Sequence, residues 1–204
     1  MRHKAFTRIE LVVVLLILGT IAAILFPVFA RVRDNHKPSC QSTMKQIGLG
    51  FLQYQQDYGE QFPVTRNRVS GEGWVEILQP YLKSTALFQC PKESYRAGDS
   101  PTEPHFSDYW MNRRLSGQNR KNLSEITQTW AILAGDGNDG SDATTSSYAL
   151  SQLPIAWRRD PQSPARRHLD YGNYLYLDGH VKALKPEKVT TQTARVGEAT
   201  FAVR

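Results

Sequence analysis

The chain has 204 residues, with 25 Lys or Arg and 19 Asp or Glu, so its formal net charge is +6. Setting aside an apolar run near the N-terminus, about 150 residues remain, which is room for one small domain with a modest core. The basic residues are scattered in short pairs, a pattern typical of a solvated surface rather than of a phosphate-binding patch. We therefore do not expect nucleic acid as a partner.

The first element in chain order is an apolar run. Residues 11–30 contain no charged side chain. Twenty helical residues span about 30 Å, the thickness of the hydrocarbon core of a bilayer. The apolar region of a cleaved secretory signal is shorter, about 7–15 residues, so we predict a transmembrane helix. Glu10 directly precedes the run, and an ionisable residue at such a helix is a functional candidate because it is costly without a partner.

Residues 4–10 (Lys-Ala-Phe-Thr-Arg-Ile-Glu) and the run after them resemble the leader and first helix of type IV prepilins and type II secretion pseudopilins. In that family a short basic leader is cut directly before a Phe, and a Glu is the fifth residue of the mature chain. The resemblance implies cleavage between Ala5 and Phe6, N-methylation of Phe6 and an assembly role for Glu10. Ala5 replaces the usual Gly, and Arg8 stands where an apolar residue is usual.

The resemblance also implies a location and partners. The leader would stay in the cytoplasm, the helix would cross the bacterial inner membrane once, and the C-terminal domain would be exported to the periplasm or to a cell-surface filament. The partners would be prepilin peptidase, an inner-membrane assembly platform, membrane lipid, and other pilin or pseudopilin subunits in a homo- or hetero-filament. We expect no enzymatic activity.

The segment after the apolar run carries a stripe of apolar side chains. They recur every three or four residues: Cys40, Met44, Ile47, Phe51, Tyr54 and Tyr58. This period predicts an amphipathic helix that packs on its own domain. Pro38 predicts a break or kink near residues 34–39, and Gly59 and Pro63 predict the end of the helix.

Short elements follow. Residues 74–82 predict a short helix, residues 109–111 a short strand or helical turn, and residues 129–134 a buried strand after a turn. Residues 173–184 hold two β-prone runs joined at Asp178-Gly179, which predicts a tight β-hairpin. The expected fold class is α+β, with a long N-terminal helix on a small antiparallel sheet, as in type IV pilins.

The chain is thereby divided into five segments. They are a leader (1–5), a transmembrane half-helix (6–30), an amphipathic half-helix (31–60), an exported globular domain (61–184) and a tail (185–204). The tail is rich in Thr and charged residues, which is consistent with a short edge strand or with disorder.

Cys40 and Cys90 are the cysteines of the chain. In an exported domain two cysteines indicate one disulfide, which we predict. Two free buried thiols or a metal site are the alternatives. A metal site needs further cysteines or nearby histidines at regular spacing, which the sequence does not show.

His168 is followed by nine residues and then by Asp178-Gly179. With the leader, this spacing resembles a family of bacterial pilin-like proteins that carry a C-terminal His-x9-Asp-Gly signature, and the match covers most of residues 4–184. Acid–base chemistry at His168 lacks a nucleophile motif and a second convergent carboxylate. A metal site with Asp178 and His180 lacks a fourth ligand. We favour a structural role, in which His168 bonds to the hairpin turn or to Asp178.

Calcium is the one cofactor that the sequence leaves open. Residues 135–142 predict a flexible acidic loop with three candidate ligands, as in some pseudopilins: Asp136, Asp139 and Asp142. The loop does not match the EF-hand spacing, and its Gly and Asn residues are common turn formers.

Two functional hypotheses of different class follow. The first is a pilin or pseudopilin subunit that assembles into a type IV pilus-like or type II secretion-like filament. The alternative is a membrane-anchored periplasmic binding or enzymatic domain that carries a pilin-type leader. The first makes Glu10 essential for assembly, whereas the second predicts a monomer whose activity depends on His168.

Overall fold

The computed structural model describes residues 8–31, 36–92, 100–141 and 143–203, and side chains only outside residues 24–39. Ala5 and Phe6 lie outside the described residues, as do residues 34 and 35 of the predicted kink, whereas residues 36–39 are helical. The chain divides into two units, residues 1–37 and residues 38–204.

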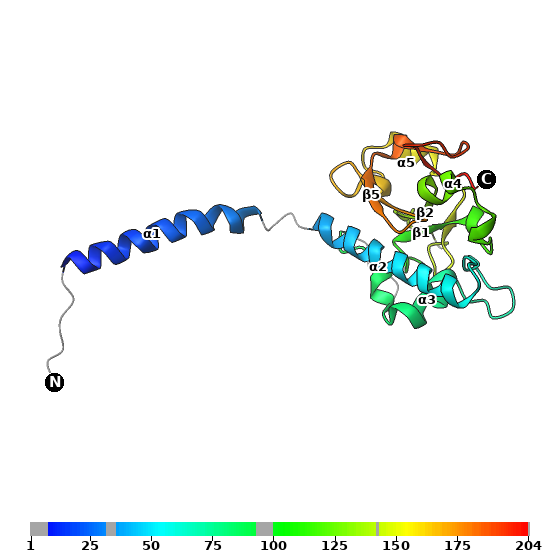
Figure 1. The fold of residues 1–204 in the computed structure, drawn as a ribbon, viewed down its shortest axis with the longest axis horizontal. Coiled ribbons are helices and arrows are strands. Elements are labelled where there is room, and N and C mark those ends of the chain that lie inside the picture. Colours follow the sequence, from blue (N-terminus) through cyan, green and yellow to red (C-terminus); the bar gives the residue numbers. More distant parts are fainter. Residues whose placement is uncertain (1–7, 32–35, 93–99, 142, 204) are drawn as a thin grey trace. The chain divides into compact units, whose positions relative to one another are not determined.

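The first unit contains α1 (Arg8–Arg31), drawn in dark blue in Figure 1. Glu10 lies in its first turn. The described apolar side chains of α1, such as Ile9 and Leu16, are exposed. In the part of the chain that the structure describes, no helix reaches the length and apolarity needed to cross a membrane.

The second unit has mixed α+β structure. Its helices are α2 (His36–Asp57), α3 (Trp74–Leu82), α4 (Glu125–Trp130) and α5 (Ile155–Arg159). The first two residues of α2 precede the boundary between the two units at Pro38. Its strands are β1 (Tyr109–Asn112), β2 (Ile132–Asp136), β3 (Ala149–Leu150), β4 (Gly172–Tyr176), β5 (Val181–Leu184), β6 (Val189–Thr190) and β7 (Ala199–Thr200). Single 3₁₀ turns lie at Thr85–Phe88, Arg113–Leu115, Arg120–Asn122, Pro164–Arg166 and Pro186–Lys188.

Five of the described strands form one sheet in the order β3-β1-β2-β4-β5. All its pairs are antiparallel except β1 with β3, and β6 pairs with β7 separately in parallel. The predicted antiparallel sheet is therefore confirmed apart from this short edge strand.

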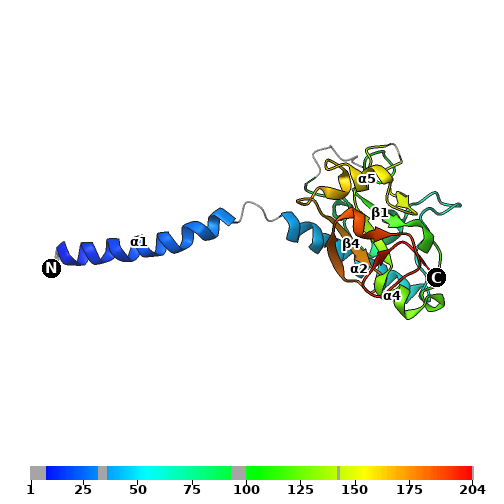
Figure 2. The same cartoon turned by 90° about the horizontal axis from the view of Figure 1, so that it is seen from above.

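Helix α2 covers one face of the sheet (Figure 2). The predicted stripe is confirmed as far as Phe51, because Cys40, Met44, Ile47 and Phe51 are all buried; Tyr58, at the end, is exposed. A Cβ at Gly48 would lie 2.9 Å from a methyl carbon of Leu175 in β4. The missing side chain at this position therefore lets helix and sheet approach closely.

The opposite face of the sheet is covered by the C-terminal segment and α5. The Phe201 ring stacks on Trp110 of β1, with ring centroids 4.9 Å apart, and is fully buried. Residues 185–204, which we set apart as a tail, thus contribute to the core on this face of the sheet. Of the two alternatives for this segment, short strands are observed, as β6 and β7. A single aromatic residue in a polar stretch carries no periodic signal, so the sequence pattern does not reveal this contribution.

The C-terminal hairpin is confirmed. Strands β4 and β5 are joined by residues 177–180, and the Gly179 N–H donates to the Tyr176 carbonyl (3.0 Å). Gly179 has a φ of 90°, a conformation that glycine adopts without strain.

The strand predicted over residues 129–134 begins later, at Ile132. Thr129 and Trp130 belong to α4, which is capped by Ser124: its hydroxyl oxygen accepts the Thr127 N–H at 3.2 Å. The cap favours helix over the β-propensity of these residues.

We predict that Phe201→Ala lowers the unfolding free energy by about 3–5 kcal/mol, because it opens a cavity over Trp110. Val196→Ala, at a residue of the same segment that is 76% exposed, should change it by less than about 0.5 kcal/mol. Urea unfolding of the full chain in detergent, followed by tryptophan fluorescence, measures both. Equal midpoints for the two variants would show that the C-terminal segment is not part of the core.

Candidate functional site

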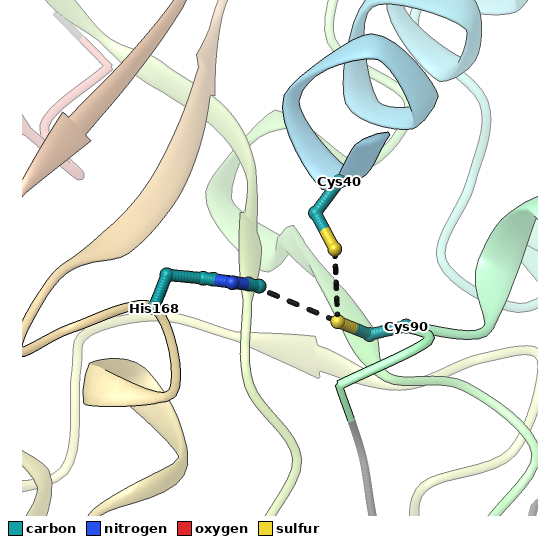
Figure 3. A group of neighbouring side chains, drawn as sticks. All are labelled: Cys40, Cys90 and His168. Carbon is teal, nitrogen blue, oxygen red and sulfur yellow. Dashed lines mark hydrogen bonds between the residues drawn. The ribbon is translucent and has the colours of Figure 1, made fainter. Parts of the chain in front are cut away.

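A group of reactive side chains lies inside the core, on the face of the sheet that α2 covers. We call Cys40, Cys90, Asp136 and His168 the buried cluster; none of the four is more than 4% exposed. Figure 3 shows Cys40, Cys90 and His168 pointing toward one another from three separate segments. Sequence analysis singled out each residue, but in three separate contexts: Cys40 and Cys90 as a disulfide pair, Asp136 as a calcium candidate and His168 as part of the C-terminal signature.

Local structure aims each side chain inward. Cys40 belongs to the apolar stripe of α2, and Asp136 is the last residue of β2. Cys90 follows a 3₁₀ turn, where its backbone N–H donates to Asp108 Oδ2 at 2.6 Å.

His168 opens a tight turn that precedes β4. Its N–H donates to the Tyr171 carbonyl at 3.1 Å, and Leu169 and Asp170 adopt φ values of 54° and 71°. The left-handed conformation costs a non-glycine residue about 1–2 kcal/mol. Such strain persists only where the surroundings fix it, and here the turn directs the His168 ring into the core.

The sulfur atoms of Cys40 and Cys90 are 3.2 Å apart, and both residues are free thiols in the structure. The structure thus brings the predicted disulfide partners together without a bond between them, and the disulfide stays a prediction. His168 Nε2 lies 3.8 Å from the Cys90 sulfur and makes a close ion pair with Asp136 Oδ2.

Polar groups around the cluster balance its charges. The Asn173 amide donates to Asp136 Oδ2 (3.3 Å), and Arg167 Nε lies 3.6 Å from Asp136 Oδ1. Arg167 also lies 3.8 Å from Asp108, whose carboxylate accepts the side-chain amide of Asn138. A buried charge is tolerated only when it is paired and hydrogen-bonded, and this network supplies both.

The network shifts the pKa values of the cluster. Burial alone lowers the pKa of His168, but the hydrogen bonds to Asp136 and Cys90, together with the Asp136 charge, outweigh it and raise the pKa to about 9. The contact between the thiols lowers the pKa of Cys40 and raises that of Cys90, which burial raises further. The Cys40 thiol, with the lowered pKa, is therefore the more acidic of the two thiols, and the Cys90 thiol is the less acidic.

The predicted contact between His168 and Asp178 is wrong. Asp178 lies on the surface and accepts from His180, through its backbone N–H at 3.0 Å and its ring Nδ1 at 2.5 Å. The partner of His168 is Asp136, which we had placed in a flexible loop. The apolar run before Asp136 was the available signal, because it implies that the carboxylate ends a buried strand.

The buried cluster does not have the geometry of a Cys-His-Asp triad. In a triad the nucleophile and the carboxylate meet opposite nitrogens of the imidazole. Here Cys90 and Asp136 both approach Nε2, and His168 Nδ1 has no hydrogen-bond partner among the described residues. The burial of all three side chains also leaves no direct path for a substrate.

The calcium candidates are not brought together as a site. Asp136 points into the core, whereas Asp139 is exposed and accepts the Ser141 hydroxyl at 2.6 Å; Asp142 lies outside the described residues. Within the described part of the chain, Cys40, Cys90 and His168 form the group of side chains suited to a metal ion, with donor atoms within 4.8 Å of one another. The sequence shows no histidine at regular spacing from the cysteines, and it is the fold that brings His168 to them.

A surface cleft of about 580 Å³ lies beside α5. Its charged lining residues are Lys92, Asp139, Asp160, Arg166 and Arg167. Because Arg167 also contacts Asp108 and Asp136, this side chain connects the cleft to the surroundings of the buried cluster.

Comparison of the chain with protein-family models, with curated proteins and with solved structures gives no match.

We predict that Asp136→Asn lowers the unfolding free energy by about 3–5 kcal/mol, because it leaves protonated His168 buried without its carboxylate and removes the Asp136 charge from Arg167, which keeps its contact with Asp108. The same substitution at exposed Asp178 should cost no more than about 1 kcal/mol. Thermal or urea unfolding of the full-length variants in parallel measures both. A larger loss for Asp178→Asn would restore that residue as the structural partner of His168.

Proposed function

We propose that this protein is a pilin-like subunit that prepilin peptidase cleaves and N-methylates, and that then assembles into a type IV pilus-like or type II secretion-like filament at the bacterial inner membrane. The observation that carries the proposal is the Phe6 to Glu10 spacing directly before an uncharged run of twenty residues.

The arrangement of the helices supports this proposal. Helix α1 includes Glu10 and the whole of the uncharged run, and its described apolar side chains are exposed; Leu16, for example, is 64% exposed. An exposed apolar face of this size marks a contact surface. The amphipathic stripe, by contrast, is used within the second unit, where α2 packs on the sheet. In the proposed filament, lipid or other subunits would cover α1.

Glu10 would act in assembly through its charge. Cleavage before Phe6 would create a new amino group four residues before Glu10 in the sequence. A carboxylate in an apolar bundle costs several kcal/mol, and a matched cation from a neighbouring subunit removes much of that cost. Pairing of Glu10 with the neighbour's Phe6 amine would therefore set the axial register of subunits.

The alternative, an anchored binding domain, draws support from the charged cleft beside α5. It requires neither cleavage nor assembly. An experiment can distinguish this alternative from the first proposal, because a binding domain would act as an uncleaved monomer.

We expect the chain from native membranes to begin at N-methylated Phe6. Intact-mass measurement with N-terminal peptide sequencing checks this directly. An Ala5→Glu chain, with a bulky charge at the cleavage position, should retain its leader. A wild-type chain that still begins at Met1 would make the protein a fixed anchor and would favour the binding-domain alternative.

We expect Glu10→Val to insert into the membrane and to be cleaved normally, but to reduce filaments at least about tenfold, since the loss of one ion pair in an apolar setting is worth more than about 1.4 kcal/mol. Glu125→Val removes an exposed carboxylate of α4 in the second unit and is the matched control. Immunoblots of sheared filaments against membrane fractions give the ratio. Normal filament abundance for Glu10→Val would remove the proposed role of this residue.

A further inference from the structure

Three soft or borderline metal-binding atoms converge in the buried cluster. The two cysteine sulfurs are 3.2 Å apart, His168 Nε2 is 3.8 Å from the Cys90 sulfur, and all three donor atoms lie within 4.8 Å of one another (Figure 3). They come from α2, from the segment after a 3₁₀ turn and from the turn before β4. Local chain geometry therefore cannot account for their meeting.

These separations fit the edges of a zinc tetrahedron. Zinc–sulfur bonds of about 2.3 Å and zinc–nitrogen bonds of about 2.0 Å place two thiolates about 3.8 Å apart and a thiolate about 3.5 Å from an imidazole nitrogen. The observed 3.2 Å and 3.8 Å differ from these values by less than about 1 Å. Small side-chain rotations would bring the sulfur pair and the histidine to the zinc-bound geometry.

Asp136 is the candidate for the fourth donor, although it is not one of the three residues whose donor atoms all lie within 4.8 Å of one another. Its Oδ2 contacts Nε2, the same ring nitrogen that faces Cys90. Once that nitrogen binds an ion, it no longer holds a proton for the carboxylate, and a shift of Oδ2 toward the sulfurs would bring it to the fourth coordination position. Asn173 and Arg167 hold the Asp136 carboxylate from other sides, as outer-shell groups do in zinc sites.

We propose that Cys40, Cys90, His168 and Asp136 bind one structural Zn²⁺. The ion replaces the two thiol protons and the proton that His168 shares with Asp136. Two thiolates neutralise the ion, and the Asp136 charge lies next to Arg167. Thiolate and imidazole ligands select zinc over calcium or magnesium, which prefer oxygen.

The same sulfurs cannot form a disulfide and bind zinc at once. A disulfide links two of the four groups and leaves His168 paired with Asp136. A zinc ion uses all four groups and cross-links α2, β2 and two loops of the second unit. Its binding free energy then adds to the folding free energy.

The first test measures zinc in the full chain, purified in detergent with a thiol reductant. We expect one Zn²⁺ per chain by elemental analysis. Zinc should protect both cysteines from alkylation, and a chelator should remove the protection. In Co²⁺-exchanged protein we expect the visible absorption of tetrahedral cobalt together with a near-ultraviolet thiolate charge-transfer band.

Variants then assign the ligands. Cys90→Ser and His168→Ala should abolish stoichiometric zinc, and Asp136→Asn should weaken binding about 10–100-fold. His180→Ala, at the exposed histidine beside Asp178, should bind as wild type. Alkylation of the wild-type chain with and without zinc gives the answer independently if a variant fails to fold.

Two results would overturn the proposal. One is a reduced wild-type chain that takes up no zinc, or that binds it equally well as Cys90→Ser. The other is protein from native membranes that carries a Cys40–Cys90 disulfide, detected by intact mass before and after reduction, and no zinc.

Discussion

The packing of α2 on the sheet is the contact on which the rest of the second unit depends. Each large apolar side chain that becomes fully buried contributes about 1.5–3 kcal/mol, and α2 places Met44, Ile47 and Phe51 in the core. Gly48 lets the helix approach Leu175, which brings Cys40 to the level of the buried polar groups. The position of the buried cluster is thus a consequence of helix packing.

Whereas the packing of α2 stabilises the fold, burial of the charged side chains costs free energy of folding. Desolvation of Asp136, His168, Arg167 and Asp108 is unfavourable, and their mutual contacts offset the cost only with good geometry. The strained turn at Leu169 and Asp170 adds a further cost. A stable domain needs none of these features, since apolar residues of similar volume would pack as well. Their combination at one place therefore indicates a role for the cluster beyond packing, which metal binding would supply.

The sequence predicted what local periodicity and turn chemistry determine. The stripe of α2, helix α3 and the hairpin at Asp178-Gly179 each have a signal within a few residues. The C-terminal segment and the contact of His168 with Asp136 are long-range, and no spacing along the chain reveals them. The regular His-x9-Asp-Gly spacing even suggested the wrong partner, because His168 lies outside the hairpin and its ring points away from that turn, into the core.

Export and zinc binding make different demands on the cysteines. Thiols that reach an oxidising compartment are commonly converted to disulfides. Cys40 is fully buried and Cys90 is 4% exposed, so oxidants reach the sulfurs of the folded domain poorly. With the proposed zinc site, zinc and oxidation would therefore compete for the sulfurs before the domain is folded, when α2 has not yet covered the sheet. An ion acquired at that stage would hold both sulfurs as thiolates and would fix α2 to β2 in one step. The state of this cysteine pair in the native protein thus records which event came first, oxidation or metal binding.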